Sequence, residues 1–178
     1  LDLLLSNIQD LVAEQRVNKI AADYYHFSQW LDQNASSNYE FIIIDAPAST
    51  SPISINAMLA ADLIIVPLEC EALAIKSLKR FLQAFKELQK NIEPDLRLAG
   101  ILLTMYDDEI LSHQQVCRQI YQTLGDSVFE TIIPNCPYIL EASSMGIDVI
   151  QRHLNSEGAT GYIRLANELL DRFLLPKS

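Results

Sequence analysis

The chain has 178 residues, of which 49% are hydrophobic and 20% charged, and its formal net charge is −10. This length and composition suit one globular domain with a sizeable core and exclude an intrinsically disordered chain. The negative charge argues against a protein that coats nucleic acid with its whole surface, because phosphate binding requires clustered Lys and Arg. We find neither a run of about 20 apolar residues nor a signal-peptide pattern, which predicts a cytoplasmic protein without a membrane span.

The three cysteines, Cys70, Cys117 and Cys136, form no C-x-x-C pair, and no histidine stands near two of them at zinc-site spacing. We therefore expect the cysteines to act as small hydrophobic residues of a protein in a reducing compartment. They predict neither a disulfide framework nor a structural metal site. The three histidines are scattered and show no triad-like arrangement with Ser or Cys, so we assign them no catalytic role.

In the first part of the chain, apolar residues at three- and four-residue steps predict a helix over residues 18–33. Residues 41–44 are an unalternating, mostly β-branched run, which is typical of a strand buried on both faces of a parallel sheet. A loop over residues 47–52 follows, then a short helix over 53–61 and a second buried strand over 62–67.

The rest of the chain continues the alternation of helices and strands. Predicted helices cover residues 71–90, 112–124, 137–145 and 159–174, and predicted strands cover residues 96–105 and 128–133. This alternation predicts an α/β fold with a mostly parallel sheet and helices on both faces. Ligands of such folds bind beyond the carboxyl ends of the strands, so we expect four segments to meet there: Asp45, 67–71, 104–107 and 134–137.

Asp45 is the first candidate for chemistry, because it follows the run 41–44 at the expected ligand edge. A carboxylate in this position can hold Mg²⁺ through water beside nucleotide phosphates. The pattern alone is weak, since many α/β proteins end a buried strand in Asp. The loop over 46–49 can respond to a γ-phosphate, or it is an ordinary strand-to-helix turn.

Several blocks of the sequence together resemble the second part of a ParA/Soj ATPase, of the MinD/ParA class of P-loop NTPases. The blocks that carry the resemblance are residues 41–47, 55–57, 60–62, 65–67, 69–71, 100–107 and 128–134. The resemblance implies a P-loop NTPase-like fold of the deviant Walker A class, with residues 1–178 forming a single, partial nucleotide-binding domain. It also implies ATP and Mg²⁺ as cofactors.

The resemblance further implies roles for individual residues. Asp45 resembles the Walker B aspartate that holds Mg²⁺ through water, and the loop with Pro47, Ser49 and Ser51 resembles switch II.

The second part of the chain resembles the segments of the family that lie near the adenine of the bound nucleotide. By the same resemblance, Thr104, Met105 and Pro134 would lie near the adenine. No residue of the chain resembles the one that positions the attacking water.

The sequence departs from the family pattern in two important ways. The chain has only five glycines and contains no G-x-x-x-x-G-K-[ST] motif. We therefore expect the N-terminal strand and the P-loop to be missing, and the chain alone to hydrolyse no ATP. The abrupt start of the match at Leu1 favours a truncated fragment over an activity that was lost. Asn135 and Tyr138 replace arginines of relatives, which weakens the case for nonspecific DNA binding.

The resemblance implies a ParA-like ATPase for plasmid or chromosome partitioning or cargo positioning, with an ATP-dependent homodimer as the switch, hydrolysis as its reset and a ParB-like adaptor. The alternative is a non-catalytic interaction module derived from ParA. A MinD-like membrane relative is least favoured, because residues 159–178 form no basic amphipathic helix. The basic side of the predicted helix 71–90 is either a DNA or partner surface or a solvated face.

Overall fold

The computed structural model describes residues 2, 17, 19–35, 38–47, 49 and 51–174 of the chain. The chain divides into two compact units, each of which is described by itself. The first unit consists of Leu1–Ile64 and Gln83–Arg97, and the second of Ile65–Leu82 and Leu98–Ser178. That residues 1–178 form one nucleotide-binding domain stays a prediction.

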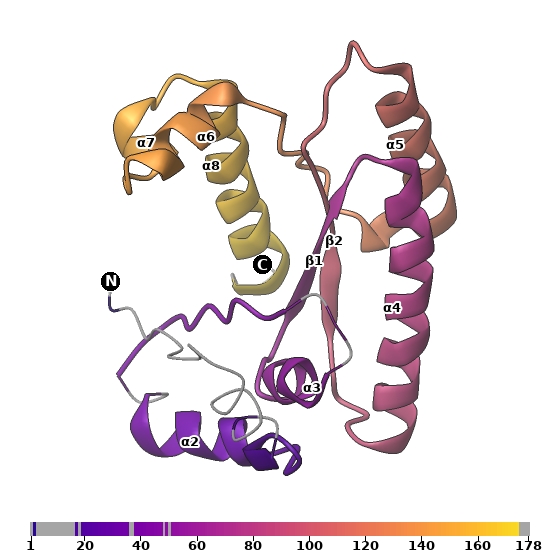
Figure 1. Cartoon of the computed structure of the whole chain (residues 1–178), viewed down its shortest axis with the longest axis vertical. Coiled ribbons are helices and arrows are strands. Elements are labelled where there is room, and N and C mark those ends of the chain that lie inside the picture. Colours follow the sequence, from indigo (N-terminus) through magenta and orange to yellow (C-terminus); the bar gives the residue numbers. More distant parts are fainter. Residues whose placement is uncertain are drawn as a thin grey trace. The chain divides into compact units, whose positions relative to one another are not determined.

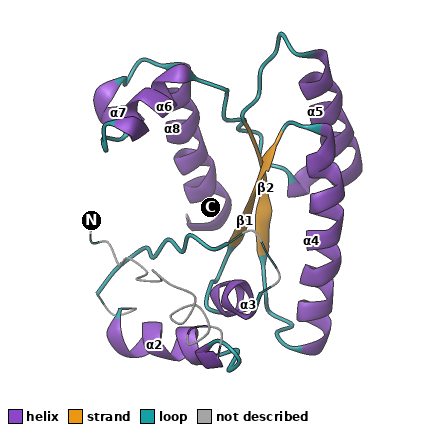
Figure 2. Ribbon diagram, viewed as in Figure 1, coloured by secondary structure: helices purple, strands orange, loops and turns teal. Residues whose placement is uncertain are grey.

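Helices and strands alternate along the described chain, as Figures 1 and 2 show. The strands are β1 (Ile64–Glu69) and β2 (Leu98–Thr104). The helices are α2 (His26–Asn34), α3 (Pro52–Leu59), α4 (Ala72–Asn91), α5 (Leu111–Leu124), α6 (Pro137–Ser144), α7 (Val149–Arg152) and α8 (Glu157–Leu169), with a 3₁₀ turn at Gly125–Ser127 and a π-helical turn at Leu170–Leu174. Most predicted elements are thus confirmed to within a few residues, and α7 was not predicted because four residues carry too short a pattern.

The sheet is parallel, as predicted. The Ile64 N–H donates to the Arg97 carbonyl (2.9 Å), and at the other end of the pair the Cys70 N–H donates to the Thr104 carbonyl (3.2 Å). Both strands therefore advance in the same direction at nearly constant register. This pairing confirms the strands that were predicted over 62–67 and 96–105.

Residues 128–133 pair with β2 but form no continuous strand. The segment is held by isolated parallel bridges, one of which joins Ile101 to Val128. Between the bridges, the N–H groups of Glu130 and Thr131 donate to the carboxylate of Glu168 on α8, at 2.8 and 2.9 Å. Phe129 and Ile133 donate to β2, so the Thr131 N–H would belong to the same ladder, but the Glu168 carboxylate accepts it instead, and the predicted strand is interrupted there.

The strand predicted over residues 41–44 is wrong. Residues 41–47 have no regular structure, and Ile43 is 93% exposed. A β-branched run favours extended backbone, but a strand forms only where a neighbouring segment pairs with it. Among the described residues the sheet contains β1 and β2 only, so the run has no partner there.

The helix predicted over residues 18–33 is also interrupted. Residues 21–25 form turns, and α2 begins only at His26. The carbonyls of Ala21 and Asp23 accept hydrogen bonds from the side chain of Asn56, at 2.7 and 3.0 Å. These carbonyls would have served a continuous helix, so a distant polar side chain outcompetes the local periodicity.

The core of the second unit lies between β2 and the helices on one face of the sheet. Ile101 and Leu103 are 0% exposed and pack with Leu78 of α4 and with Val116 and Ile120 of α5. Figure 1 shows α5 and the start of α4 on one side of the strands and α8 on the other. The α/β fold with helices on both faces is therefore confirmed in this unit. None of the described helices has the length and apolar character that crossing a membrane requires.

Two glycines allow α8 to approach its neighbours closely. A Cβ added at Gly158 would lie 2.7 Å from two side-chain carbons of Ile139, whereas one at Gly161 would lie 3.3 Å from carbons of Ile133 and Pro134. The first distance is a clash, and the second requires only a small adjustment.

We therefore expect Gly158→Ala to be less stable than Gly161→Ala by about 1–3 kcal/mol in the free energy of unfolding. Both changes add the same helix propensity, so their difference isolates the clash with Ile139. Urea unfolding of the two variants measures this difference. Equal stabilities would contradict the close packing of α8.

Candidate functional site

The carboxyl ends of β1, β2 and the segment after residue 128 meet in the second unit. Beyond the Cys70–Thr104 bond, the Tyr106 N–H donates to the Ile133 carbonyl (3.2 Å) and the Asn135 N–H donates to the Tyr106 carbonyl (2.7 Å). A parallel bridge also joins Tyr106 to Pro134. Three of the four segments that we expected at this edge are thus brought together, and with them the predicted residues Thr104, Met105 and Pro134.

Met105 holds a strained backbone at this edge. Its φ angle is 54°, in the left-handed region that side chains other than Gly rarely adopt, and its side chain is 49% exposed. Such a conformation costs of order 1–3 kcal/mol and persists only where the surroundings enforce it. Here the bonds of Thr104 and Tyr106 on either side fix the chain, so an apolar side chain is presented to solvent next to Tyr106.

A histidine that the sequence analysis left without a role orders the loop after β2. The Asp107 N–H donates to Nδ1 of His113 (3.2 Å), and the Asp107 carboxylate accepts from the Glu109 N–H (2.9 Å). His113 lies in the first turn of α5, six residues after Asp107. The signal in the sequence was a polar residue at a helix start behind an acidic loop, which is too common to single it out.

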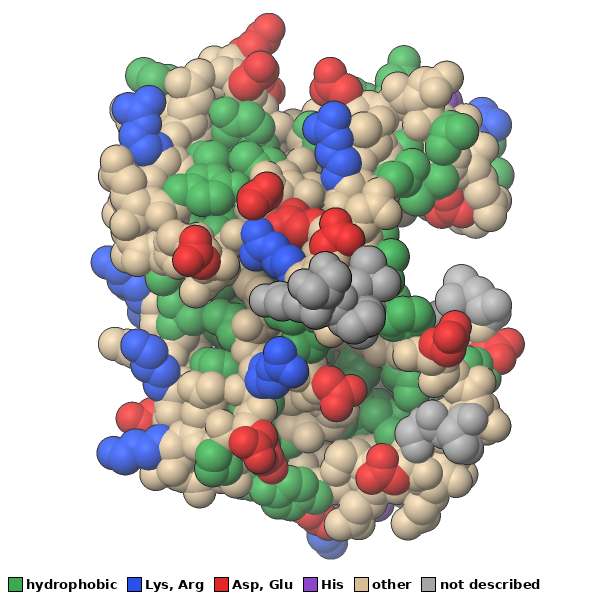
Figure 3. All heavy atoms as spheres, turned by 180° about the vertical axis from the view of Figure 1, so that it is seen from behind, with side chains coloured by type: hydrophobic (Ala, Val, Ile, Leu, Met, Phe, Trp, Pro, Cys, Tyr) green, Lys and Arg blue, Asp and Glu red, His purple; other side chains and the backbone are tan. Residues whose placement is uncertain are grey.

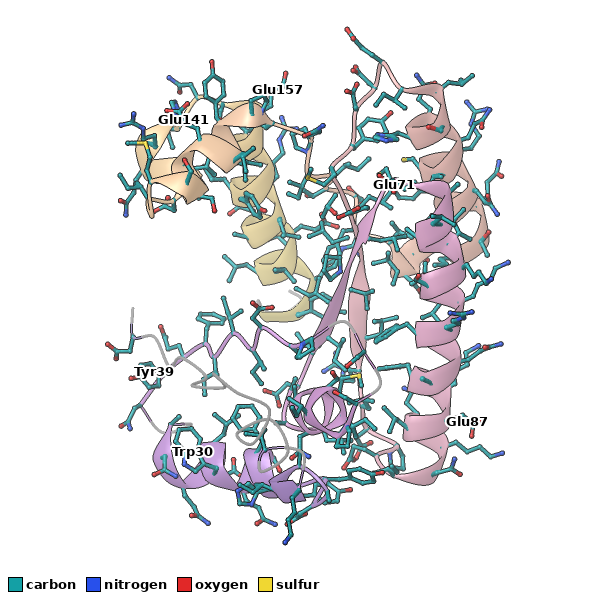
Figure 4. All side chains as sticks on the ribbon, viewed as in Figure 1. Trp30, Tyr39, Glu71, Glu87, Glu141 and Glu157 are labelled. Atoms are coloured by element: carbon teal, nitrogen blue, oxygen red, sulfur yellow. The ribbon has the colours of Figure 1, made fainter. Side chains whose placement is uncertain are left out.

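The buried cysteine at this edge is chemically quiet. Cys70 is 0% exposed, and burial raises the pKa of its thiol to about 11. Burial also raises the pKa of the Cys117 thiol on α5. Because the thiolate is the nucleophile, neither residue is poised for covalent chemistry at neutral pH. Glu71, the next residue in the chain, lies where β1 leads into α4 (Figure 4).

The predicted switch loop lies in the first unit and is organised by Ser54. This side chain is 2% exposed, and its hydroxyl donates to the Pro47 carbonyl (2.9 Å). The same hydroxyl lies 2.9 Å from Oγ of Ser49 and 3.2 Å from Oγ of Ser51. The structure thus brings together Pro47, Ser49 and Ser51, the three residues that were predicted for switch II.

The loop leads directly into a capped helix. Ser51 is the N-cap of α3, with its hydroxyl accepting from the Ser54 N–H (3.4 Å), and Pro52 occupies the first helical position. Both features favour a helix start at this point. Ser54 itself was missed, because a single Ser within an apolar helix gives no sign of what its hydroxyl contacts.

Asp45 lies two residues before Pro47 and is exposed. Among the residues that the structure describes, no group of three or more His, Cys, Asp or Glu side chains could hold a metal ion. Mg²⁺ beside a nucleotide needs only one or two carboxylates, with water and phosphate as its other ligands. Asp45 therefore fits a water-mediated Mg²⁺ contact, whereas no Gly- and Lys-rich phosphate loop occurs in residues 1–178.

A charged node attaches the end of α8 to the segment beside β2. Oε1 of Glu168 lies 2.6 Å from Nη2 of Arg172, whose guanidinium also lies over the ring of Phe129, 5.3 Å from its centroid. Burial alone would raise the pKa of Glu168. Hydrogen bonds from Thr131 and Glu130 and the charge of Arg172 outweigh burial and lower this pKa below its ordinary value.

We expect Glu168→Gln to lower the free energy of unfolding by about 2 kcal/mol at neutral pH, because it removes a charged acceptor from two backbone donors. The folded-state pKa is lowered, so this stabilisation is present above the unfolded pKa and is lost as pH falls through the folded value. The difference between the two proteins should therefore shrink as pH falls below 4.5.

Urea unfolding at several pH values measures this difference, with Glu130→Gln as the matched control. The Glu130 side chain is 91% exposed and lies 4.0 Å from Arg172, so its loss should change stability by less than about 0.5 kcal/mol. A pH-independent difference for Glu168→Gln would contradict the charged node.

The sequence matches known proteins along most of its length. The family described as "AAA domain" matches residues 1–98. The chain is 40% identical over 134 residues to the chromosome-partitioning ATPase Soj of Thermus thermophilus, which covers 75% of this chain and 54% of Soj. It is 33% identical over 138 residues to the chromosome partitioning protein ParA of Caulobacter vibrioides, covering 78% and 52%. The chain thus spans about half the length of the curated relatives it matches.

A solved structure shares the fold. The structure of cobyrinic acid a,c-diamide synthase from Mycobacterium smegmatis, with bound ATP analogue and magnesium, matches with a TM-score of 0.73 and 27% sequence identity. The match covers 91% of this chain and 59% of that chain. The arrangement of β1, β2 and their helices is therefore one that occurs in a nucleotide-binding protein.

Proposed function

Because this chain belongs to the ParA/Soj family of ATPases, we propose that it is part of a cytoplasmic ATPase that partitions chromosomes or plasmids or positions other cargo. The relatives named above are a chromosome-partitioning ATPase and a chromosome partitioning protein. The observation that carries the proposal is the identity of 40% to Soj, which runs through three quarters of the chain. The non-catalytic module is not favoured, since the named relatives partition chromosomes.

The proposed ligand is ATP with Mg²⁺, as in the structure that contains an ATP analogue and magnesium. Thr104, Met105 and Pro134 form the adenine end of the proposed site. Their support is that the ends of β1, β2 and the segment 128–133 meet there and that Met105 holds an exposed apolar side chain next to Tyr106, which bridges to Pro134. When bound, Mg²⁺ would neutralise phosphate charge, and Asp45 would hold it through water.

The loop with Pro47, Ser49 and Ser51 is the proposed switch. Its hydroxyls bond to one another and to the loop backbone, so a small change near Pro47 would rearrange several bonds together. ATP-dependent formation of a homodimer would be the active state, hydrolysis would reset it, and a ParB-like adaptor would act on this cycle. The phosphate-binding lysines of the family are not found within residues 1–178, so the chain alone should release no phosphate from ATP.

Calorimetric titration of Mg·ATP into the chain tests the proposed site. We expect binding without hydrolysis, weakened at least about tenfold by Asp45→Ala, because a lost carboxylate–Mg²⁺ contact is worth more than about 1.4 kcal/mol. Asp62→Ala is the matched control, since Asp62 is also an exposed carboxylate of the first unit.

With EDTA in place of Mg²⁺, wild type and Asp45→Ala should bind ATP equally. A folded chain that shows no Mg·ATP binding, or an Asp62→Ala variant that weakens it as much as Asp45→Ala does, would contradict the proposed site.

Binding to nonspecific DNA is proposed to be weak. Asn135 and Tyr138 are exposed where relatives carry arginines, and the Tyr138 ring packs against His153 with centroids 4.4 Å apart. Among the described residues, the exposed side of α4 carries basic side chains that include Lys76, Lys79 and Lys86. On the face seen in Figure 3, basic and acidic side chains are interspersed with exposed hydrophobic ones. Such mixing dilutes the positive field that DNA needs.

Restoring the charges tests this explanation. We expect Asn135→Arg with Tyr138→Arg to tighten binding to nonspecific duplex DNA and to steepen the slope of log K against log salt by about 2, since each phosphate contact contributes about 0.9. Fluorescence anisotropy at several salt concentrations measures both effects. The matched control, Asn135→Gln with Tyr138→Phe, should leave the slope unchanged, and an unchanged slope in the double Arg variant would contradict the proposal.

A further inference from the structure

Two polar side chains on α3 are buried without a role in the proposed chemistry. Ser54 is 2% exposed and Asn56 is 5% exposed, and they are the buried polar side chains of the described chain. Burying a polar group is unfavourable unless its hydrogen bonds are satisfied. Both residues are satisfied, and their partners lie in segments that are far from each other in the sequence.

Asn56 closes the turn that precedes α2. Its Nδ2 donates to the carbonyls of Ala21 (2.7 Å), Asp23 (3.0 Å) and Pro52 (3.3 Å). Its Oδ1 accepts from the Phe27 N–H (3.2 Å). One amide therefore fixes the backbone before α2, the first turn of α2 and the start of α3. Figure 1 shows α2 and α3 close together in the first unit, in agreement with their contacts.

Ser54 fixes the other side of α3. Its hydroxyl donates to the Pro47 carbonyl and contacts the hydroxyls of Ser49 and Ser51, as described above. Residues two apart on a helix point in different directions, so Ser54 and Asn56 face different neighbours. Because α3 has only eight residues, it cannot follow the loop on one side without straining the bonds on the other.

We propose that Ser54 and Asn56 are positioning residues that make α3 a rigid coupler between the Pro47–Ser51 loop and the Ala21–Phe27 turn. A rearrangement of the loop pulls on Ser54, moves α3, and strains the Asn56 bonds that hold the start of α2. The proposed coupling rests on the proposed function only because the loop is called a switch. The coupling itself is a property of the chain without nucleotide.

A coupling between two sites must act equally in both directions. If each bond stabilised only its own surroundings, its loss would loosen only the adjacent segment. If α3 couples the two, loss of the Ser54 hydroxyl must loosen the start of α2, which it does not touch. Loss of the Asn56 amide must likewise loosen the loop at Ser49 and Ser51, which the amide does not contact; its bond to this side of α3 ends at the Pro52 carbonyl. Faster amide exchange in the distant segment therefore distinguishes coupling from a purely local role.

Amide hydrogen exchange of the full chain, without nucleotide, tests this directly. We expect Ser54→Ala to speed exchange of the amides at 27–31 about tenfold, and Asn56→Ala to speed exchange at Ser49 and Ser51 by a similar factor. Exchange at β2 should stay unchanged in both variants, which shows that the chain has not unfolded globally. Asn91→Ala is the matched control, because its amide bonds an exposed Glu87 carboxylate (3.1 Å).

Two conservative variants keep the test decisive if an alanine variant fails to fold. Ser54→Thr keeps the hydroxyl and should retain wild-type exchange at 27–31. Asn56→Asp keeps an acceptor for the Phe27 N–H but loses the donors, so it should speed exchange at Ser49 and Ser51.

Changes confined to the segment beside each substitution would overturn the coupling, and so would a Thr variant that behaves like Ala. Remote changes in a chain that binds no Mg·ATP would support the coupling and count only against the proposed function.

Discussion

The central constraint on the second unit is that β2 must be paired on both edges and covered on both faces. Its residues Ile101 and Leu103 are 0% exposed, and its backbone bonds β1 on one side and residues 128–134 on the other. The backbone N–H and C=O groups of a strand in this position cannot bond to water if a strand partner is missing. The register of pairing on each side is therefore fixed. That register decides where the three chain segments end together, and hence where Met105 is held at positive φ.

In the first unit, two buried polar side chains of α3 hold segments that form no strand. Ser54 and Asn56 are buried and hydrogen-bonded. Through them the short helix α3 holds both the loop after Asp45 and the turn before α2. In the proposed function, the strand ends of the second unit would hold the base, and the loop of the first unit, with its bonded hydroxyls of Ser49, Ser51 and Ser54, would be the switch. In the second unit, the ion pair of Glu168 with Arg172 and the bond from the Glu130 N–H to Glu168 attach α8 to the segment beside β2.

The sequence predicted what local periodicity controls and failed where distant groups intervene. The amphipathic stripe over 71–90 and the apolar run over 96–105 both became elements within two residues of their predicted ends. The run over 41–44 has the same strand-like composition but lacks a pairing partner among the described residues. Asp45 could be singled out by its position after an apolar run and by resemblance, and Met105 by resemblance alone. The role of Asn56 could not, because its partners lie about 30 residues away and leave no periodic trace.

We propose that the strand ends of the second unit form the adenine end of a nucleotide site. An amide chemical-shift titration of the isotope-labelled chain with a non-hydrolysable Mg·ATP analogue tests this proposal. We expect the largest shifts at Met105, Tyr106 and Asn135, with a second group in the loop after Asp45. Shifts confined to the basic side of α4, or spread evenly over the chain, would contradict it.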